Sequence, residues 1–183
     1  GRYLGTSDIG STPVQSIWAF KDPMTDAGLG TLRSNADMQQ KTIATTTDGE
    51  RRVDSTTVDL GTKAGWYVDL ADPTSSRIVV DPVLDVGVVG FAVNVPNENG
   101  ACEAGGKSYF LSIDFTTGAG SILEGGAGKL TDSLISSIQL VKIGNDYHWR
   151  VTYFDPAKPP ALFKQPFSIP VAPGRVSWRE IAN

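Results

Sequence analysis

The chain has 183 residues, of which 40% are hydrophobic and 20% are charged, and its formal net charge is −4. This is the composition of a soluble globular domain with one hydrophobic core. The acidic balance and the dispersed Lys and Arg residues argue against nucleic acid as a partner, because nucleic-acid binders concentrate basic residues on one face. No apolar stretch approaches the ~20 residues of a transmembrane helix, so we expect no membrane span.

The counts of cysteine and histidine exclude several kinds of chemistry. The chain has one cysteine, Cys102, and one histidine, His148. A single cysteine excludes an internal disulfide framework and multi-cysteine metal sites, and a single histidine excludes His-rich zinc sites. The first residues contain neither an initiator methionine nor a signal-peptide pattern. We therefore expect a piece of a longer protein or a processed product.

Strand patterns dominate the first two thirds of the chain. Residues 42–47 (TIATTT) form a β-branched run, and Asp48-Gly49 after it is a favoured hairpin turn, so residues 50–60 can return as a partner strand. Residues 65–70 (GWYVDL) alternate in the manner of a half-buried strand. Further strands are expected at residues 77–84, 87–95 and 108–115.

The last third of the chain shows the same pattern of short strands separated by turn residues. Residues 138–143 and 147–154 flank Gly144-Asn145-Asp146, which predicts a tight hairpin. Two more short strands are expected beyond a proline-rich bend, at 167–171 and 175–181, and helical turns fit only 22–40 and 130–137. Short strands at spacings of ~8–12 residues indicate an all-β sandwich, barrel or propeller. A weak internal repeat is compatible with four-stranded propeller blades in series, although a sandwich would give a similar pattern.

The glycine-rich loop around Cys102 invites two chemical hypotheses, and both fail. A phosphate-binding loop needs a glycine where Ala101 stands, and it needs a helix after Lys107-Ser108, whereas the following residues alternate like a strand. A cysteine nucleophile needs a base, and His148 lies in a predicted strand without a visible partner. Cys102 is then a small loop residue or a thiol that pairs with a cysteine outside this segment.

The remaining candidates for chemistry are carboxylates and tryptophans. The pairs Asp69/Asp72 and Asp81/Asp85 carry no specific glycosidase signature, and the acidic residues around Asp48-Gly49 are explained by the hairpin turn. Tryptophans in the strands could line a carbohydrate or quinone face, but alternating strand patterns place them more often in the core. We expect no catalytic residue and no metal site.

Residues 65–118 contain an extended motif, which runs from Gly-Trp-Tyr-x-Asp-Leu at 65–70 through apolar strands ending in proline to Cys102, Gly105-Gly106 and a close on Asp-x-x-Thr-Gly at 114–118. In this motif the chain resembles the PilC/PilY family of type IV pilus biogenesis and tip-associated proteins. The start (GRYLGTSDIGSTPVQSIWAFKD) and the end (GRVSWREI) agree with the family in order. Ala101 replaces the family's proline before the cysteine.

The resemblance implies the C-terminal part of a β-propeller that is similar to quinoprotein dehydrogenases in fold. Residues 1–183 would then be a single all-β domain of about three antiparallel four-stranded blades, a partial ring. Its implied function is non-enzymatic support of pilus assembly and adhesion at the cell surface or pilus tip, which is reached through the periplasm and outer membrane. The implied partners are minor pilins or other tip proteins, a host surface receptor, and the remaining blades of the parent protein.

The resemblance also defines the candidate site residues. Cys102, Gly105 and Gly106 form the family-motif loop, in which Cys102 is a candidate for a disulfide. No cofactor is expected in this segment, because the family's calcium-binding Asp-rich loop is not among these residues. The alternatives are a quinoprotein-like dehydrogenase fragment and a carbohydrate-binding β-domain. The latter would use surface aromatic contacts at Trp66, Trp149 or Trp178.

Overall fold

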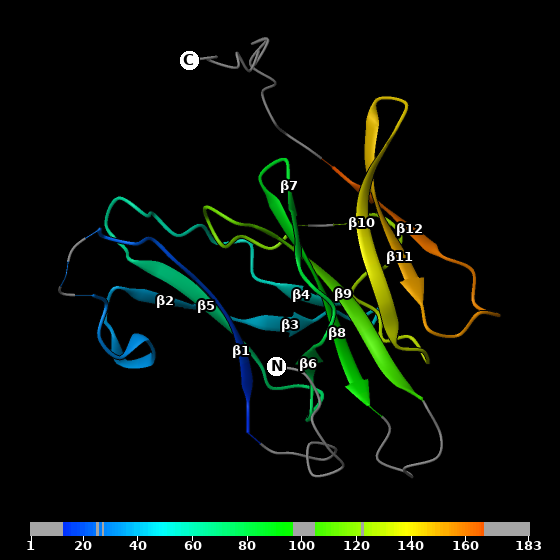
Figure 1. Cartoon of the computed structure of the whole chain (residues 1–183), viewed down its shortest axis with the longest axis horizontal. Helices are drawn as coiled ribbons and strands as arrows, with labels where there is room; N and C mark the ends of the chain where they lie inside the picture. The colour runs from blue at the N-terminus through cyan, green and yellow to red at the C-terminus, as the bar shows by residue number, and fades with distance from the viewer. Residues whose placement is uncertain (1–12, 25, 27, 97–104, 122, 167–183) are drawn as a thin grey trace, which may run out of the picture.

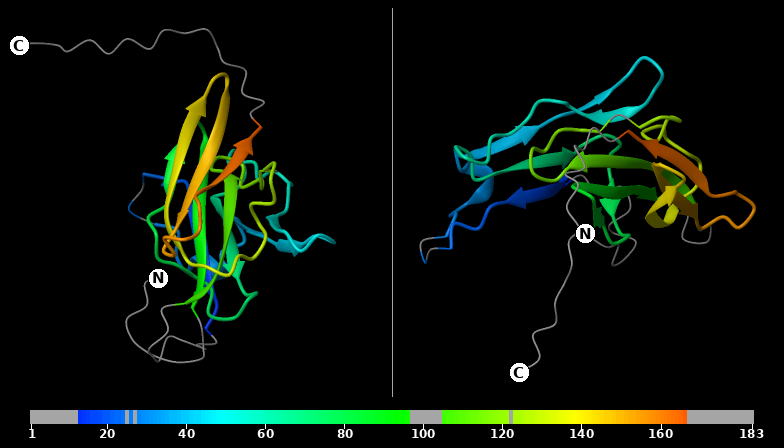
Figure 2. Two further views of the ribbon diagram at one scale, coloured as in Figure 1. Left: turned by 90° about the vertical axis from the view of Figure 1, so that its right-hand side faces the viewer. Right: turned by 90° about the horizontal axis from the view of Figure 1, so that it is seen from above.

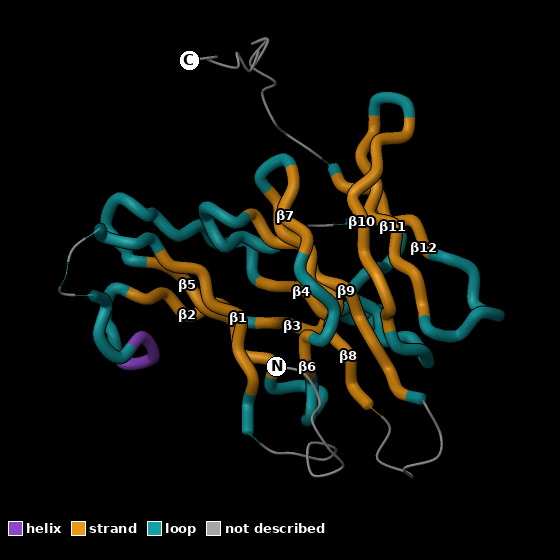
Figure 3. The backbone as a smooth tube through the Cα atoms, in the orientation of Figure 1, coloured by secondary structure: helices purple, strands orange, loops and turns teal. Residues whose placement is uncertain are grey.

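The computed structural model describes residues 13–24, 26, 28–96, 105–121 and 123–166 (Figure 1). Within these ranges the chain forms strands, connecting loops and one short 3₁₀-helix, η2 (Leu32–Ser34), and it contains no α-helix (Figure 3). The all-β prediction is confirmed.

The first sheet has the strand order β1-β5-β2 and combines both pairing directions. β1 (Gln15–Phe20) pairs antiparallel with β5 (Gly65–Leu70), and β2 (Met38–Lys41) pairs parallel with β5. The parallel pair corrects the expectation of purely antiparallel sheets. It is possible because the chain between β2 and β5 is long enough to return to the same end, as a parallel connection requires.

That connection contains the hairpin of β3 (Ile43–Thr45) and β4 (Arg51–Val53). Its turn is the predicted one, and Gly49 has a φ of 79°, which glycine adopts without steric cost. The backbone N–H of Arg51 donates to the carbonyl of Gly128, which attaches the hairpin to the segment after the middle sheet.

The middle sheet is built on the long hairpin of β8 (Val88–Pro96) and β9 (Gly106–Asp114). β6 (Arg77–Ile78) and β7 (Val83–Asp85) pair with different parts of β8 along the same edge, so together they act as one interrupted strand. Pro82 lies in the interruption, where its missing N–H costs no ladder hydrogen bond. Residues 119–121 and 127–131 add irregular backbone hydrogen bonds to the free edge of β9.

The third sheet is an antiparallel meander in the order β10-β11-β12. β10 (Ile135–Ile143) and β11 (Asp146–Tyr153) form the predicted hairpin, whose turn contains Gly144 with a φ of 63°. β12 (Ala161–Gln165) follows the proline-rich bend, where no strand was predicted. The predicted strands at 167–171 and 175–181 lie outside the described residues.

The three larger sheets follow one another in chain order across the molecule (Figure 2). The two hydrophobic core clusters lie on opposite faces of the middle sheet, which is therefore buried on both sides. Alternate residues of β8 and β9 point to opposite sides, as strand geometry requires. Val93 and Leu111 pack with Trp66 in the core shared with the first sheet, whereas Ala92 and Phe110 join the core shared with the third. The described residues form no closed ring, so the propeller stays a prediction.

The two regions expected to hold helical turns have different outcomes: η2 confirms a helical turn within residues 22–40, whereas the prediction for residues 130–137 is wrong. Residues 22–40 contain η2 and then β2, and residues 130–137 contain no helical turn. In the second region strand pairing with distant segments, Thr131 with Ser108 and β10 with β11, takes the place of local helical hydrogen bonds. Tertiary pairing thus overrides weak local propensity.

Candidate functional site

The outer face of the first sheet carries a stacked aromatic pair. Side chains alternate along the strands, so Trp18 and Tyr67 point away from the core that holds Trp66. Trp18 lies opposite Tyr67 in the strand register, and the two ring centroids are 4.5 Å apart with an interplanar angle of 19°. Trp18 is half-buried and Tyr67 is buried. The pair therefore forms a rigid feature of this face.

Arg33, at the centre of η2, covers the aromatic pair. Its guanidinium carbon lies 5.3 Å from the Trp18 ring centroid and 5.4 Å from that of Tyr67, within cation–π range. The same guanidinium donates two hydrogen bonds of 3.0 Å to the Asp69 carboxylate, one to each oxygen. Bidentate geometry fixes the plane of the guanidinium as well as its position.

Asp69 is the centre of the polar part of this cluster. Besides Arg33, the hydroxyl of Ser16 donates to one of its oxygens, and the side-chain amide of Gln40 donates to the other at 3.1 Å. Burial raises the pKa of Asp69, but the hydrogen bonds from Arg33 and Ser16 outweigh burial and hold it below its usual value. The hydrogen bond to Asp69 in turn raises the pKa of Arg33. The pair is therefore ionised at neutral pH.

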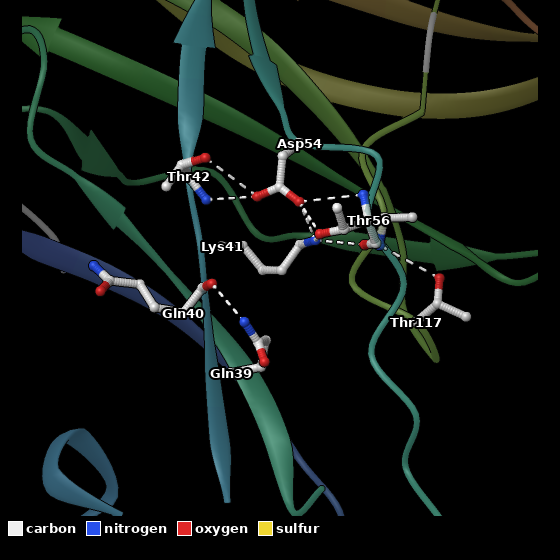
Figure 4. Close-up of polar contacts among 8 residues, drawn as sticks. Gln39, Gln40, Lys41, Thr42, Asp54, Thr56 and Thr117 are labelled. Atoms are coloured by element: carbon white, nitrogen blue, oxygen red, sulfur yellow. Dashed lines mark hydrogen bonds and ion pairs between the residues drawn. The ribbon is translucent and has the colours of Figure 1, made fainter. Parts of the chain in front are cut away.

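Lys41, the last residue of β2, is held in a second network on the opposite side of the strand (Figure 4). Its side chain is 0% exposed, and its ammonium donates to the Asp54 carboxylate and to the carbonyl and hydroxyl oxygens of Thr56. Asp54 also accepts the backbone N–H of Thr42 at 2.7 Å. All three ammonium protons thus have acceptors, which a buried charge requires.

The environment of Asp54 favours its ionised form. Burial raises its pKa, but the hydrogen bonds from Lys41, Thr56 and the backbone of Thr42 together lower it well below the usual range. The carboxylate is therefore ionised at neutral pH. It locks the start of β3 to the segment that follows β4.

A cleft of about 210 Å³ opens between β3 and the end of β5. The residues that line it are mostly polar: Gln40, Lys41, Thr42, Ile43, Thr45, Asp69, Ala71 and Asp72. Gln40 and Asp69 belong to both the cleft and the aromatic cluster, whereas Lys41 connects the cleft to the buried network. The guanidinium of Arg51 lies 3.4 Å from the Asp72 carboxylate.

The structure corrects the suggestion that Trp66 and Trp149 are surface contacts. Trp66 is 1% exposed and Trp149 is 0% exposed. Trp66 Nε1 donates to the carbonyl of Phe115 at 3.2 Å, and Trp149 Nε1 donates to Gln165 Oε1 at 2.9 Å. Both indoles are core residues with satisfied N–H groups, so neither presents a ring face to a ligand. Trp178 lies outside the described residues.

The family-motif loop is described only at its end. Cys102 lies outside the described residues, so its disulfide stays a prediction. Gly105 is half-buried directly before β9, and Gly106 is the first residue of β9. A Cβ at Gly106 would lie 2.4 Å from the carbonyl oxygen of Val95, so the close approach of β8 explains this glycine. A strand follows the loop, which confirms that the loop does not open a phosphate-binding helix.

The other chemical candidates are placed as follows. His148 lies on the outer face of the third sheet, opposite Val141 and Lys164 in the register. Asp69 and Asp72 line one cleft, but Asp69 has a lowered pKa, the opposite of what a general acid needs. Nowhere in the described residues do three or more His, Cys, Asp or Glu side chains gather as a metal site would require.

Sequence reasoning missed the residues that the fold brings together. Trp18 alternates with Ile17 and Ala19, and this pattern could have placed it on the outer face. Arg33 and Lys41 stand in polar stretches with no local signal. Their partners Asp69 and Asp54 are 36 and 13 residues away in sequence.

Comparison with known proteins gives one informative match. Over 126 residues the chain is 27% identical to a protein named type IV pilus biogenesis factor PilY1 homolog, from Xylella fastidiosa. The match covers 67% of this chain and 9% of that protein. The relation is distant. No protein-family profile matches the chain, and no solved structure matches it significantly.

Proposed function

We propose that the chain is a segment of a type IV pilus-associated factor that supports pilus assembly and tip adhesion through protein–protein contacts. The observation that carries the proposal is the similarity to the PilY1 homolog over 126 residues. The motif resemblance at residues 65–118 supports it, because those of its residues that the structure describes fall on strands β5 to β9, on the connections between them and on the turn that follows β9.

The stacked sheets suit a scaffold. The middle sheet has two buried faces, and the first and third sheets enclose it. In a larger protein the outer faces of the first and third sheets would be covered by further sheets, as in a sector of a propeller. The function then depends on loops and sheet edges presented on a rigid frame and not on bond-making chemistry.

The proposed location is the cell surface or the pilus tip, with minor pilins as the partners. The part of the chain that the structure describes has no helix long and apolar enough to cross a membrane. The proposed segment carries no cofactor of its own. Any calcium site or further adhesive region would belong to the parts of the parent protein outside this chain.

A pull-down with purified minor pilins tests the proposal. The full chain, immobilised, is expected to retain at least one minor pilin from a panel supplied singly. A variant with Val68→Asp, which places a charge at a core position that is 0% exposed, should lose this binding together with the fold. The matched surface variant Leu162→Asp, at a position 51% exposed, tests whether the third sheet's outer face takes part.

The cellular test uses the parent gene. Deleting the region that encodes this chain should reduce surface piliation, and restoring it should recover piliation. Normal piliation after the deletion, together with no minor pilin retained by the full chain, contradicts the proposal.

A further inference from the structure

The cleft between β3 and the end of β5 has a composition that points to a ligand. Its lining combines side chains of different hydrogen-bonding character with two small apolar surfaces, Ile43 and Ala71. We propose that this cleft binds one uncharged sugar ring.

The first argument is charge. The two carboxylates of the lining are each matched by an arginine: Asp69 by Arg33 at 3.0 Å and Asp72 by Arg51 at 3.4 Å. The ammonium of Lys41 is held by Asp54. The cleft therefore offers no uncompensated charge to a metal ion or a phosphate group. An uncharged ligand has the smallest desolvation penalty on entering the cleft.

The second argument is the hydrogen-bond inventory. The amide nitrogen of Gln40 is used by Asp69, which orients the carbonyl oxygen of the same side chain as a fixed acceptor. The hydroxyl of Thr42 donates to the Asp54 carboxylate at 3.3 Å and so offers a ligand only its acceptor capacity, whereas the hydroxyl of Thr45 can donate and accept. The Asp72 carboxylate, whose side chain is 77% exposed, accepts. Sugar hydroxyls also donate and accept, so a mixed lining of this kind satisfies them.

The third argument is size and rigidity. A volume of about 210 Å³ lies below the ~300–1,000 Å³ typical of pockets for drug-sized molecules, so the cleft suits a single ring and not an extended ligand. Ile43 and Ala71 offer apolar surface to the C–H groups of such a ring. Arg33 holds Asp69, and Asp69 in turn accepts a hydrogen bond from Gln40, while the Trp18–Tyr67 stack supports Arg33. The site is thus formed before the ligand arrives, which lowers the cost of binding.

Saturation-transfer NMR on the full chain tests the proposal. The probes are glucose, galactose, mannose and N-acetylglucosamine, each as the free sugar and as its methyl glycoside, with calcium chloride and inorganic phosphate as charged probes followed by amide shifts. At least one sugar should bind and shift amides within residues 40–45 and 69–72. Binding of methyl glycosides identifies a glycan end as the ligand, whereas binding of free sugars alone identifies a small solute.

Two neighbouring glutamines provide a matched pair of variants. Gln40→Ala removes a lining side chain and should weaken sugar binding about fivefold, the effect of one hydrogen bond of about 1 kcal/mol. Gln39→Ala, at the next residue and outside the lining, should leave binding unchanged. Thr45→Trp fills the cleft from an exposed position and should abolish binding while the thermal unfolding temperature is retained.

Three outcomes overturn the proposal: no sugar binds, equal weakening by both glutamine variants, or shifts within the cleft caused by calcium or phosphate and not by sugar. The measurement uses no pilin, so failure here leaves the pilin pull-down intact, and failure of the pull-down leaves sugar binding intact.

Discussion

The indole of Trp149 lies against the backbone of Gly90, where a Cβ would come within 2.7 Å of ring carbon Cη2. Gly90 belongs to β8 of the middle sheet and Trp149 to β11 of the third. Replacing Gly90 by alanine forces the ring or the strand to move. We expect Gly90→Ala to lower the free energy of unfolding by about 1–3 kcal/mol, measured by urea denaturation.

A double variant provides the control for this overpacking. Trp149→Phe makes room beside Gly90. The double variant should therefore lose less free energy of unfolding than the sum of the losses in the two single variants. Strict additivity would show that the indole is not the group that a Cβ meets.

Gln165 links the third sheet to the middle sheet. Its buried Oε1 accepts from Trp149 Nε1 at 2.9 Å and from Ser112 Oγ at 2.8 Å. Gln165→Leu leaves both donors buried without an acceptor, so we expect a loss of about 2–4 kcal/mol in the free energy of unfolding. Leu162→Ala, on the same strand and 51% exposed, should change it by less than about 0.5 kcal/mol. Equal effects of the two variants would contradict the role of Gln165.

The local elements of this fold are largely predictable from sequence. GWYVDL predicts a strand at residues 65–70, and β5 has these bounds. The Asp48-Gly49 and Gly144-Asn145 turns both appear where expected, because their residues have few other low-energy conformations. Pairing between distant segments is harder to predict from the sequence. The parallel pairing of β2 with β5 depends on which strands share a core, and no local pattern encodes that.

The candidate site was less predictable for the same reason. The chain has 16 Lys and Arg residues, and nothing in the sequence around Lys41 distinguishes a lysine whose side chain is 0% exposed from a surface lysine. For two tryptophans, by contrast, the sequence suggested surface contacts that the structure does not have. Trp66 and Trp149 stand in alternating strands, where the core interpretation carries more weight, and the structure supports that interpretation.

The Lys41–Asp54 network predicts how stability depends on pH at the acid end. The folded-state pKa of Asp54 is lowered, so its stabilising contribution is fully present above the ordinary carboxyl pKa of about 4 and is lost as the pH falls through the folded-state pKa. Asp54→Asn should therefore be less stable than the wild type at pH 7. The difference should shrink below about pH 4, as measured by urea denaturation at a series of pH values.

Lys41→Met identifies the source of this pH dependence. In a background without Lys41, the Asp54→Asn change should cost less at pH 7 and should depend less on pH, because one partner of the ion pair is gone. An unchanged pH profile in that background would contradict the assignment to the pair.

Tyr109 predicts how the stability of the fold depends on pH at the alkaline end. Burial raises its pKa to about 12, and the side chain, 1% exposed, lies in the core that the first and middle sheets share. In the unfolded chain a tyrosine titrates near about 10, so above that pH the unfolded state loses a proton that the folded state keeps. Stability should accordingly fall as the pH rises above about 10. Tyr109→Phe should make the fall shallower while changing stability at pH 7 by no more than about 1 kcal/mol.

Tyr153 serves as the comparison for this prediction. Burial also raises its pKa, but the side chain is 7% exposed and lies in the core that the middle and third sheets share. Tyr153→Phe should therefore flatten the alkaline fall less than Tyr109→Phe does. The measurement is the free energy of unfolding from denaturant titrations between pH 8 and pH 11. If wild type and Tyr109→Phe lose stability with the same slope, the hydroxyl of Tyr109 is not held in its neutral form by the core.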